Sequence, residues 1–89
     1  MEPSPHASTP SLSALILSIA SQAAEALGLD AQGRTSSQQN LGVAKLHIDL
    51  LLILQEKTKG NLSPDEDRLI RQITTDLQLR FVQSSDRGQ

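Results

Sequence analysis

The stretch "QEKTKGNLSPDEDRL", from Gln55 to Leu69, decides the fold because it carries the end signals of one helix and the start signals of another. Gly60 can adopt the left-handed conformation that closes a helix without a steric penalty. Lys57 and Lys59 precede it, and basic side chains are favourable near a helix C-terminus. We therefore expect a hinge between two helices, and a ligand-gripping loop is the alternative.

The second half of this stretch predicts a helix over about residues 63–82. Ser63 is suited to cap it, Pro64 takes its first position, and Glu66 completes a Ser-x-x-Glu capping box. Its apolar residues recur at helical spacing and predict a buried face that consists of Leu69, Ile70, Ile73, Leu77 and Phe81. Leu79 and Val82 lie off that face, which indicates a second contact surface.

Two acid–base pairs support the same helix. Asp67–Arg71 and Asp76–Arg80 are spaced four residues apart with the acid first, which is the better orientation for an ion pair on a helix.

The preceding segment "LGVAKLHIDLLLILQEKTK" predicts a helix over about residues 40–59, with Asn40 as its N-cap. Its apolar residues cover well over half of the helix circumference, whereas a stripe about 100° wide is enough for one neighbour. Contacts on several sides are therefore expected. The run "IDLLLIL" would also suit a buried strand, but its leucine bias and its helical flanks favour a helix.

The first helix is predicted over about residues 11–27. Either Thr9 before Pro10 or Ser11 before Leu12 can cap it. Its apolar positions are spaced three and four residues apart, which makes a seam along which a partner helix can pack. Gly28 is expected to end it.

The domain organisation follows from these elements. We expect a disordered N-terminal arm over residues 1–10, one all-α three-helix domain over 11–82, and a frayed tail over 83–89. The polar segment 29–39 is interpreted as a flexible connector, although a binding loop of that length is the alternative.

The composition narrows the possible functions. A chain of 89 residues with one aromatic residue and no cysteine has a small aliphatic core and no disulfide, so oligomerisation is the expected source of stability. The net charge is −2 without a basic cluster, which argues against nucleic-acid binding. No apolar run is long enough to span a membrane. A soluble, cytoplasmic protein is expected, and whether the first apolar stretch is ever processed as a secretory signal stays open.

Catalytic groups are not evident. His47, Asp49 and Ser21 invite comparison with a nucleophile–base–acid set, but residues two apart on a helix point away from each other. The two histidines lack metal-ligand spacing, and no phosphate-binding glycine loop is present. We expect no catalytic residues, no cofactor and no metal, and hence no enzyme.

Three stretches resemble a known family. They are "ILSIASQAAEALG" (Ile16–Gly28), "AKLHIDLLLILQEKTKGNLSPDEDRLI" (Ala44–Ile70) and "LQLRFV" (Leu77–Val82). Together they resemble a bacterial family of small helical proteins that is catalogued as a domain of unknown function. The resemblance covers the chain from about Ser11 to Val82, and Glu56–Leu62 is its most specific part. It implies a bacterial source and three helices, and it implies no activity.

The sequence departs from the family pattern at two positions. Ile19 stands where leucine is common, and Phe81 stands where tyrosine is common. The missing phenol argues against an essential hydroxyl at that position.

The functional prediction is a non-enzymatic module that self-associates, most simply as a homodimer through the first two helices. The candidate self-association residues are Leu12, Ile16, Ile19, Ala23, Leu46, Leu50, Ile53 and Leu54. The alternative is a small-molecule or lipid-binding bundle in which the alanines of the first helix leave room beside Leu50, Ile53 and Leu54.

A second surface is expected at the hinge. Capping requires only Gly60 and a basic residue or two, so it does not account for the whole stretch. The candidate surface for another protein partner consists of Lys57, Thr58, Lys59 and Asn61.

Overall fold

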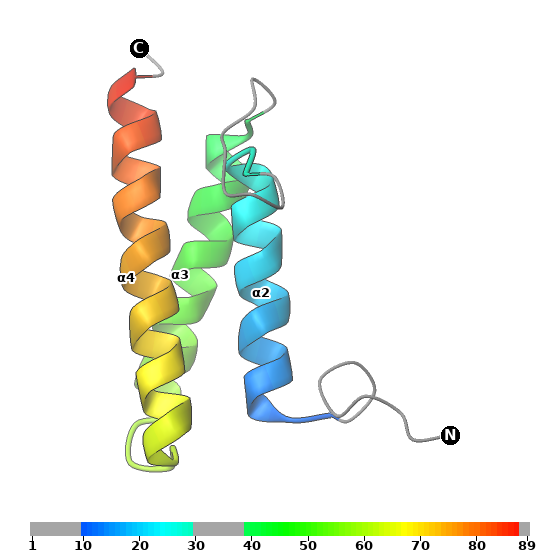
Figure 1. The fold of residues 1–89 in the computed structure, drawn as a ribbon, viewed down its shortest axis with the longest axis vertical. Helices are drawn as coiled ribbons and strands as arrows, with labels where there is room; N and C mark the ends of the chain where they lie inside the picture. The colour runs from blue at the N-terminus through cyan, green and yellow to red at the C-terminus, as the bar shows by residue number, and fades with distance from the viewer. Residues whose placement is uncertain (1–9, 30–38, 88–89) are drawn as a thin grey trace.

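The computed structural model describes residues 10–29 and 39–87. It contains three helices, α2 (Leu12–Ala26), α3 (Leu41–Lys57) and α4 (Pro64–Arg87), and its described residues form no strand. The helices run up, down and up beside one another (Figure 1). The all-α three-helix prediction is confirmed. The predicted N-terminal arm lies outside the described residues apart from Pro10, and so does the connector apart from its ends.

Side-chain caps begin the first two helices. The Ser11 hydroxyl accepts a hydrogen bond from the Ala14 N–H at 3.0 Å, so Ser11 rather than Thr9 caps α2. The Asn40 side chain accepts one from the Val43 N–H at 3.1 Å. Each cap satisfies a backbone donor that has no partner inside its helix.

The hinge between α3 and α4 has the predicted local structure. The Ser63 hydroxyl accepts from the Glu66 N–H at 3.2 Å, and a Glu66 carboxylate oxygen accepts from the Ser63 N–H at 2.8 Å. This reciprocal pair is the predicted capping box. Gly60 has a φ of 85°, which is the left-handed conformation expected of it. The helix before it ends at Lys57, two residues earlier than predicted.

Helix α2 also ends at a left-handed glycine, because Gly28 has a φ of 81°. Its N–H donates to the Glu25 carbonyl at 2.9 Å, and the Leu29 N–H donates to the Ala24 carbonyl at 3.0 Å. This pair of bonds is a Schellman motif, which satisfies carbonyls at the helix end.

The core lies along the line where the three helices meet. Its buried residues are Ile16, Ala20, Ala23, Leu27, Ala44, Ile48, Leu51, Ile70 and Leu77. Helix α2 packs most extensively on α3, and the contact between α2 and α4 is the least extensive of the three. The alanines allow α2 and α3 to approach closely, whereas the space between α2 and α4 stays partly open.

The last helix is longer than predicted. Residues 83–87 were expected to fray, but α4 continues to Arg87. Ser84 is buried, and its hydroxyl accepts a hydrogen bond at 3.1 Å from the side-chain amide of Gln39. The same amide donates to the Leu27 carbonyl at 2.9 Å. Gln39 therefore links the end of α2 to α4, which orders the final turns.

The surface of α4 follows the predicted pattern. Arg71 lies 2.9 Å from Asp67, and Arg80 lies 3.0 Å from Asp76. These exposed pairs contribute only about 0.3–0.5 kcal/mol each. Leu79 points to solvent with 56% of its surface exposed, as its position off the buried face predicts.

We predict opposite effects on stability for alanine at two glycines. Gly60→Ala forces a side chain into left-handed backbone and should lower the free energy of unfolding by about 1–2 kcal/mol. Gly42→Ala lies within α3, where the new Cβ meets only Asn40 Oδ1 at 3.6 Å. It should raise stability by about 0.5–1 kcal/mol. Urea denaturation at matched protein concentration measures both, and equal stability of Gly60→Ala and the unmodified chain would contradict the hinge geometry.

Candidate functional site

The outward side of α3 carries a row of exposed aliphatic residues, which we call the outer seam: Val43, Leu46, Leu50 and Ile53. Their side chains are 39%, 55%, 38% and 55% exposed, respectively. The spacing of three, four and three residues places them along one side of the helix. The buried residues Ala44, Ile48 and Leu51 lie on the other side, against α2 and α4. The outer seam is therefore an apolar helix face that nothing in the described chain covers.

Helix α2 widens this apolar face at one end. His47 Nε2 lies 3.0 Å from Gln22 Oε1, which fixes how α2 and α3 are aligned. Leu15 precedes Gln22 by two helical turns and lies on the same side of α2. Because the helices are antiparallel (Figure 1), Leu15 lies near the Ile53 end of the outer seam, and it is 48% exposed.

The structure separates the predicted self-association residues into three groups. Leu46, Leu50 and Ile53 are exposed, whereas Ile16 and Ala23 are fully buried within the chain. Those two form the core with α3 and α4, so the seam predicted on α2 is used inside the molecule and is not open to a partner. The remaining three, Leu12, Ile19 and Leu54, are half-buried and pack against the core.

Sequence reasoning missed two exposed members of this surface. Val43 precedes Leu46 by three residues, so the same seam spacing could have identified it. Leu15 gave no such signal, because its exposure depends on which side of α2 packs against the other helices.

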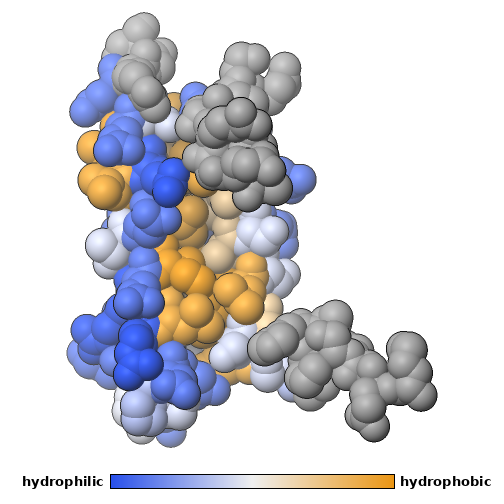
Figure 2. Space-filling model, viewed as in Figure 1, coloured by the Kyte–Doolittle hydropathy of each residue, from blue (hydrophilic) through white to orange (hydrophobic). Residues whose placement is uncertain are grey.

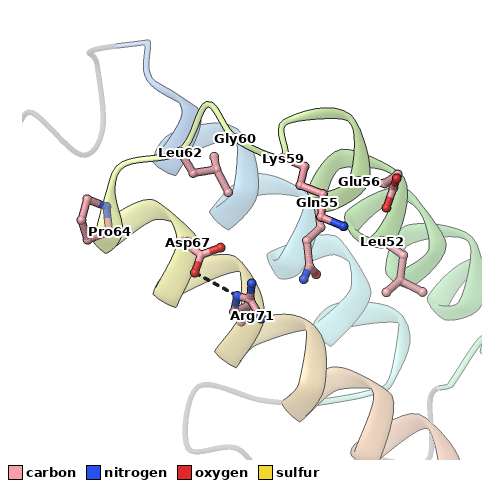
Figure 3. A pocket seen from close by; sticks show the side chains of 9 residues that line it. All are labelled: Leu52, Gln55, Glu56, Lys59, Gly60, Leu62, Pro64, Asp67 and Arg71. Atoms are coloured by element: carbon pink, nitrogen blue, oxygen red, sulfur yellow. Dashed lines mark hydrogen bonds and ion pairs between the residues drawn. The ribbon is translucent and has the colours of Figure 1, made fainter.

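A pocket of about 570 Å³ lies at the hinge between α3 and α4. Figure 3 shows that its lining side chains come from the last turns of α3, the connecting turn and the first turns of α4; they are Leu52, Gln55, Glu56, Lys59, Gly60, Leu62, Pro64, Asp67 and Arg71. Arg71 is paired with Asp67 at 2.9 Å. Two acidic and two basic side chains line the pocket, so their charges balance and favour neither anions nor cations.

The predicted partner surface overlaps this pocket at Lys59 and is only partly available. Lys57, Lys59 and Asn61 are exposed, and neither lysine forms an ion pair with any described residue. Thr58 is half-buried, and its hydroxyl donates to the Leu54 carbonyl at 2.8 Å. Thr58 therefore helps to end α3, and the lysines and Asn61 are the residues free to contact a partner.

A groove of about 600 Å³ separates α2 from α4. Its apolar side chains are Leu17, Ala20, Ala24, Leu29, Ile73 and Leu77, and charged residues stand at its edges. Figure 2 shows an apolar strip here, bordered on the α4 side by a hydrophilic surface. The space predicted beside the alanines of α2 thus opens toward α4. Leu50, Ile53 and Leu54 do not line it, contrary to the expectation.

The side chains considered for catalysis are not brought together. His47 Nδ1 is hydrogen-bonded to the Val43 carbonyl at 3.0 Å, and its Nε2 faces Gln22. Asp49 instead pairs with Lys45 at 2.8 Å, and Ser21 lines the groove between α2 and α4. Within the described ranges, no three histidine or acidic side chains are grouped to hold a metal ion.

The fold and these surfaces define a small all-α domain with uncovered apolar faces. Residues 9–83 match the family described as Domain of unknown function (DUF1844), and the chain belongs to that family. The resemblance seen in the sequence is therefore confirmed. Neither a curated protein nor a solved structure matches the chain. Among the helices that the structure describes, none has the length and apolar character needed to cross a membrane.

We predict that Thr58 and Lys59 differ in their effect on stability. Thr58→Val keeps the side-chain shape but removes the hydrogen bond to the Leu54 carbonyl, so it should lower the free energy of unfolding by about 0.5–1.5 kcal/mol. Lys59→Ala removes an exposed side chain and should change the free energy of unfolding by less than about 0.5 kcal/mol. Thermal or urea denaturation measures both. An equal loss in the two variants would contradict this division between structural and surface residues.

Proposed function

We propose that this chain is a non-enzymatic interaction module that forms a homodimer through the outer seam of α3. The observation that carries the proposal is the exposed row Val43, Leu46, Leu50 and Ile53, which has the spacing of a helix-pairing seam. Small domains rarely expose a contiguous apolar patch unless it serves as an interaction site.

The energetics favour covering this seam. Full burial of an aliphatic side chain stabilises a protein by about 1.5–3 kcal/mol relative to full exposure. The four seam residues keep between 38% and 55% of their surface exposed, so each still has a substantial part of that gain available. Adding Leu15 enlarges the area, and two copies would contribute the same surface twice.

The charges beside the middle of the seam do not oppose association. On one side, Asp49 is paired with Lys45 at 2.8 Å, so their charges largely cancel. On the other side, His47 is hydrogen-bonded to Gln22. A self-complementary apolar face between polar side chains that have partners within their own chain is suited to a two-fold interface, in which both copies use the same residues.

We also make proposals about catalysis, other partners and location. We propose no catalytic residue and no cofactor, because His47, Asp49 and Ser21 point to different neighbours. Lys57, Lys59 and Asn61 remain the proposed surface for another protein partner. The cytoplasmic location and the bacterial source also stay predictions.

We predict that Ile53→Glu dissociates the dimer. Each dimer would bury two unpaired carboxylates, which should weaken association at least about 100-fold. Gel filtration with light scattering should show the unmodified chain at twice the monomer mass and the variant at the monomer mass.

The matched control is Leu79→Glu. Leu79 on α4 is 56% exposed and Ile53 is 55% exposed, so the two variants change equally exposed positions on different helices. Leu79→Glu should keep the dimer mass, and circular dichroism should show both variants helical. A monomeric unmodified chain at micromolar concentration would refute the proposal. Masses that keep growing with concentration would also refute a closed dimer.

The groove between α2 and α4 supports a second candidate function, the binding of an apolar small molecule or an acyl chain. Its volume of about 600 Å³ lies within the usual range for ligand pockets. Ala20 and Ala24 keep it open beside Ile73 and Leu77. This function would use a different face from the outer seam.

We predict that Ala24→Leu reduces ligand capture if the groove binds one, because the larger side chain fills it. Native mass spectrometry of the purified chain should then show a bound small molecule that the variant has lost. Ser18 is exposed on α2 and does not line the groove, so the Ser18→Leu variant should keep the bound molecule. Spectra of the unmodified chain without any bound molecule would rule out this second candidate.

A further inference from the structure

We propose that the two copies pair their α3 helices in antiparallel orientation, about a two-fold axis that passes between Leu46 and Leu50. This inference rests on the proposed dimer and specifies its partner, a second copy of this chain, together with the register of the contact. Three observations support it: the order of residues along the outer seam, the position of Lys57 after the end of the seam, and the position of Leu15.

Antiparallel pairing matches the seam residues by shape. It places Val43 opposite Ile53 of the second copy, and Leu46 opposite Leu50 of the second copy. Both outer layers then pair β-branched side chains with each other, and both inner layers pair leucines. In the outer layers, Val43 is 39% exposed and Ile53 is 55% exposed. In the inner layers, Leu46 is 55% exposed and Leu50 is 38% exposed. Each layer therefore joins a more exposed side chain to a less exposed one. The outer seam of one copy is thus complementary to the outer seam of a second copy that runs in the opposite direction.

Parallel pairing meets two obstacles. Lys57 follows Ile53 by four residues and is the next position of the same row, so parallel helices would set it opposite Lys57 of the second copy. Like charges that face each other across a helix pair are unfavourable, and parallel helix dipoles add to that repulsion. Antiparallel pairing separates the two lysines, which then lie at opposite ends of the contact and remain in solvent.

The position of Leu15 gives an independent reason. Leu15 lies near the Ile53 end of the outer seam and is 48% exposed. In an antiparallel pair, this end meets the Val43 end of the second copy, so one Leu15 extends the apolar contact at each end. In a parallel pair both leucines would gather at one end, and Val43 would lack such a neighbour.

One pair of like charges approaches the axis in this arrangement. Asp49 lies beside the middle of the seam, so antiparallel pairing brings it toward Asp49 of the second copy. Lys45 pairs with Asp49 at 2.8 Å within each copy and largely neutralises the carboxylate. The approach is therefore compatible with the proposed register.

Disulfide cross-linking can read this register directly, because the chain contains no cysteine. Val43→Cys protein is mixed with isotope-labelled Ile53→Cys protein and oxidised gently. Non-reducing electrophoresis and mass spectrometry then identify which chains are joined. We expect the 43–53 disulfide between unlike chains to exceed each disulfide between like chains at least about tenfold, because a disulfide needs its two Cα atoms within about 7 Å.

A second pair of variants leaves all four seam residues unchanged, so it controls for any effect of the first cysteine substitutions on the seam. Gly42 and Glu56 are exposed and flank the two ends of the seam on one side. Gly42→Cys mixed with Glu56→Cys should give the same preference for unlike chains. Leu79→Cys on α4, mixed with either variant, should give little cross-linking. Light scattering under reducing conditions checks that each variant keeps the mass of the unmodified chain.

The outcomes separate this inference from the proposed dimer. Disulfides that join like chains at positions 43 and 53, with the dimer mass kept, would overturn the antiparallel register and leave the dimer standing. A dimer mass without cross-links from either pair of variants would also overturn the register, because another face would then form the contact. A monomeric unmodified chain would refute the dimer itself, whichever cross-links the variants give.

Discussion

The packing of Ala44, Ile48 and Leu51 against α2 and α4 is the contact on which the other features of this domain depend. These residues lie on one side of α3, and their burial forms the centre of the core. A helix that is apolar around most of its circumference must then expose what its neighbours do not cover. The outer seam is the direct consequence, because Leu46 and Ile53 project from the opposite side of the same helix.

The order of the helices along the chain determines which surfaces stay open. The short hinge from Thr58 to Ser63 returns the chain along α3, so that α3 contacts both other helices. Helices α2 and α4 have no direct connection, and their contact is the least extensive of the three. Gln39 joins them at one end through Leu27 and Ser84, and the groove remains open along the middle. The seam and the groove therefore lie on different faces of the molecule.

The candidate site shows which residues could be placed correctly from the sequence and which could not. Leu46, Leu50 and Ile53 were expected at an interface because three helices cannot cover every side of α3, and all three are exposed. Ile16 and Ala23 share the same seam-like spacing on α2, yet both are buried in the core. Spacing indicates that residues lie on one face, and it does not indicate which partner that face meets. Thr58 was similarly placed with the hinge surface, although its hydroxyl bonds to the Leu54 carbonyl.

The sequence by itself determined the features that depend on residues close in the chain. The caps at Asn40 and Ser63, the left-handed turn at Gly60 and the ion pairs along α4 involve groups within four residues of each other, so their types and spacing are sufficient. Only the tertiary structure decided which apolar side of each helix is buried and how far α4 continues. Those outcomes depend on contacts between residues far apart in the sequence, such as the hydrogen bond from Gln39 to Ser84. A local sequence pattern cannot predict such contacts.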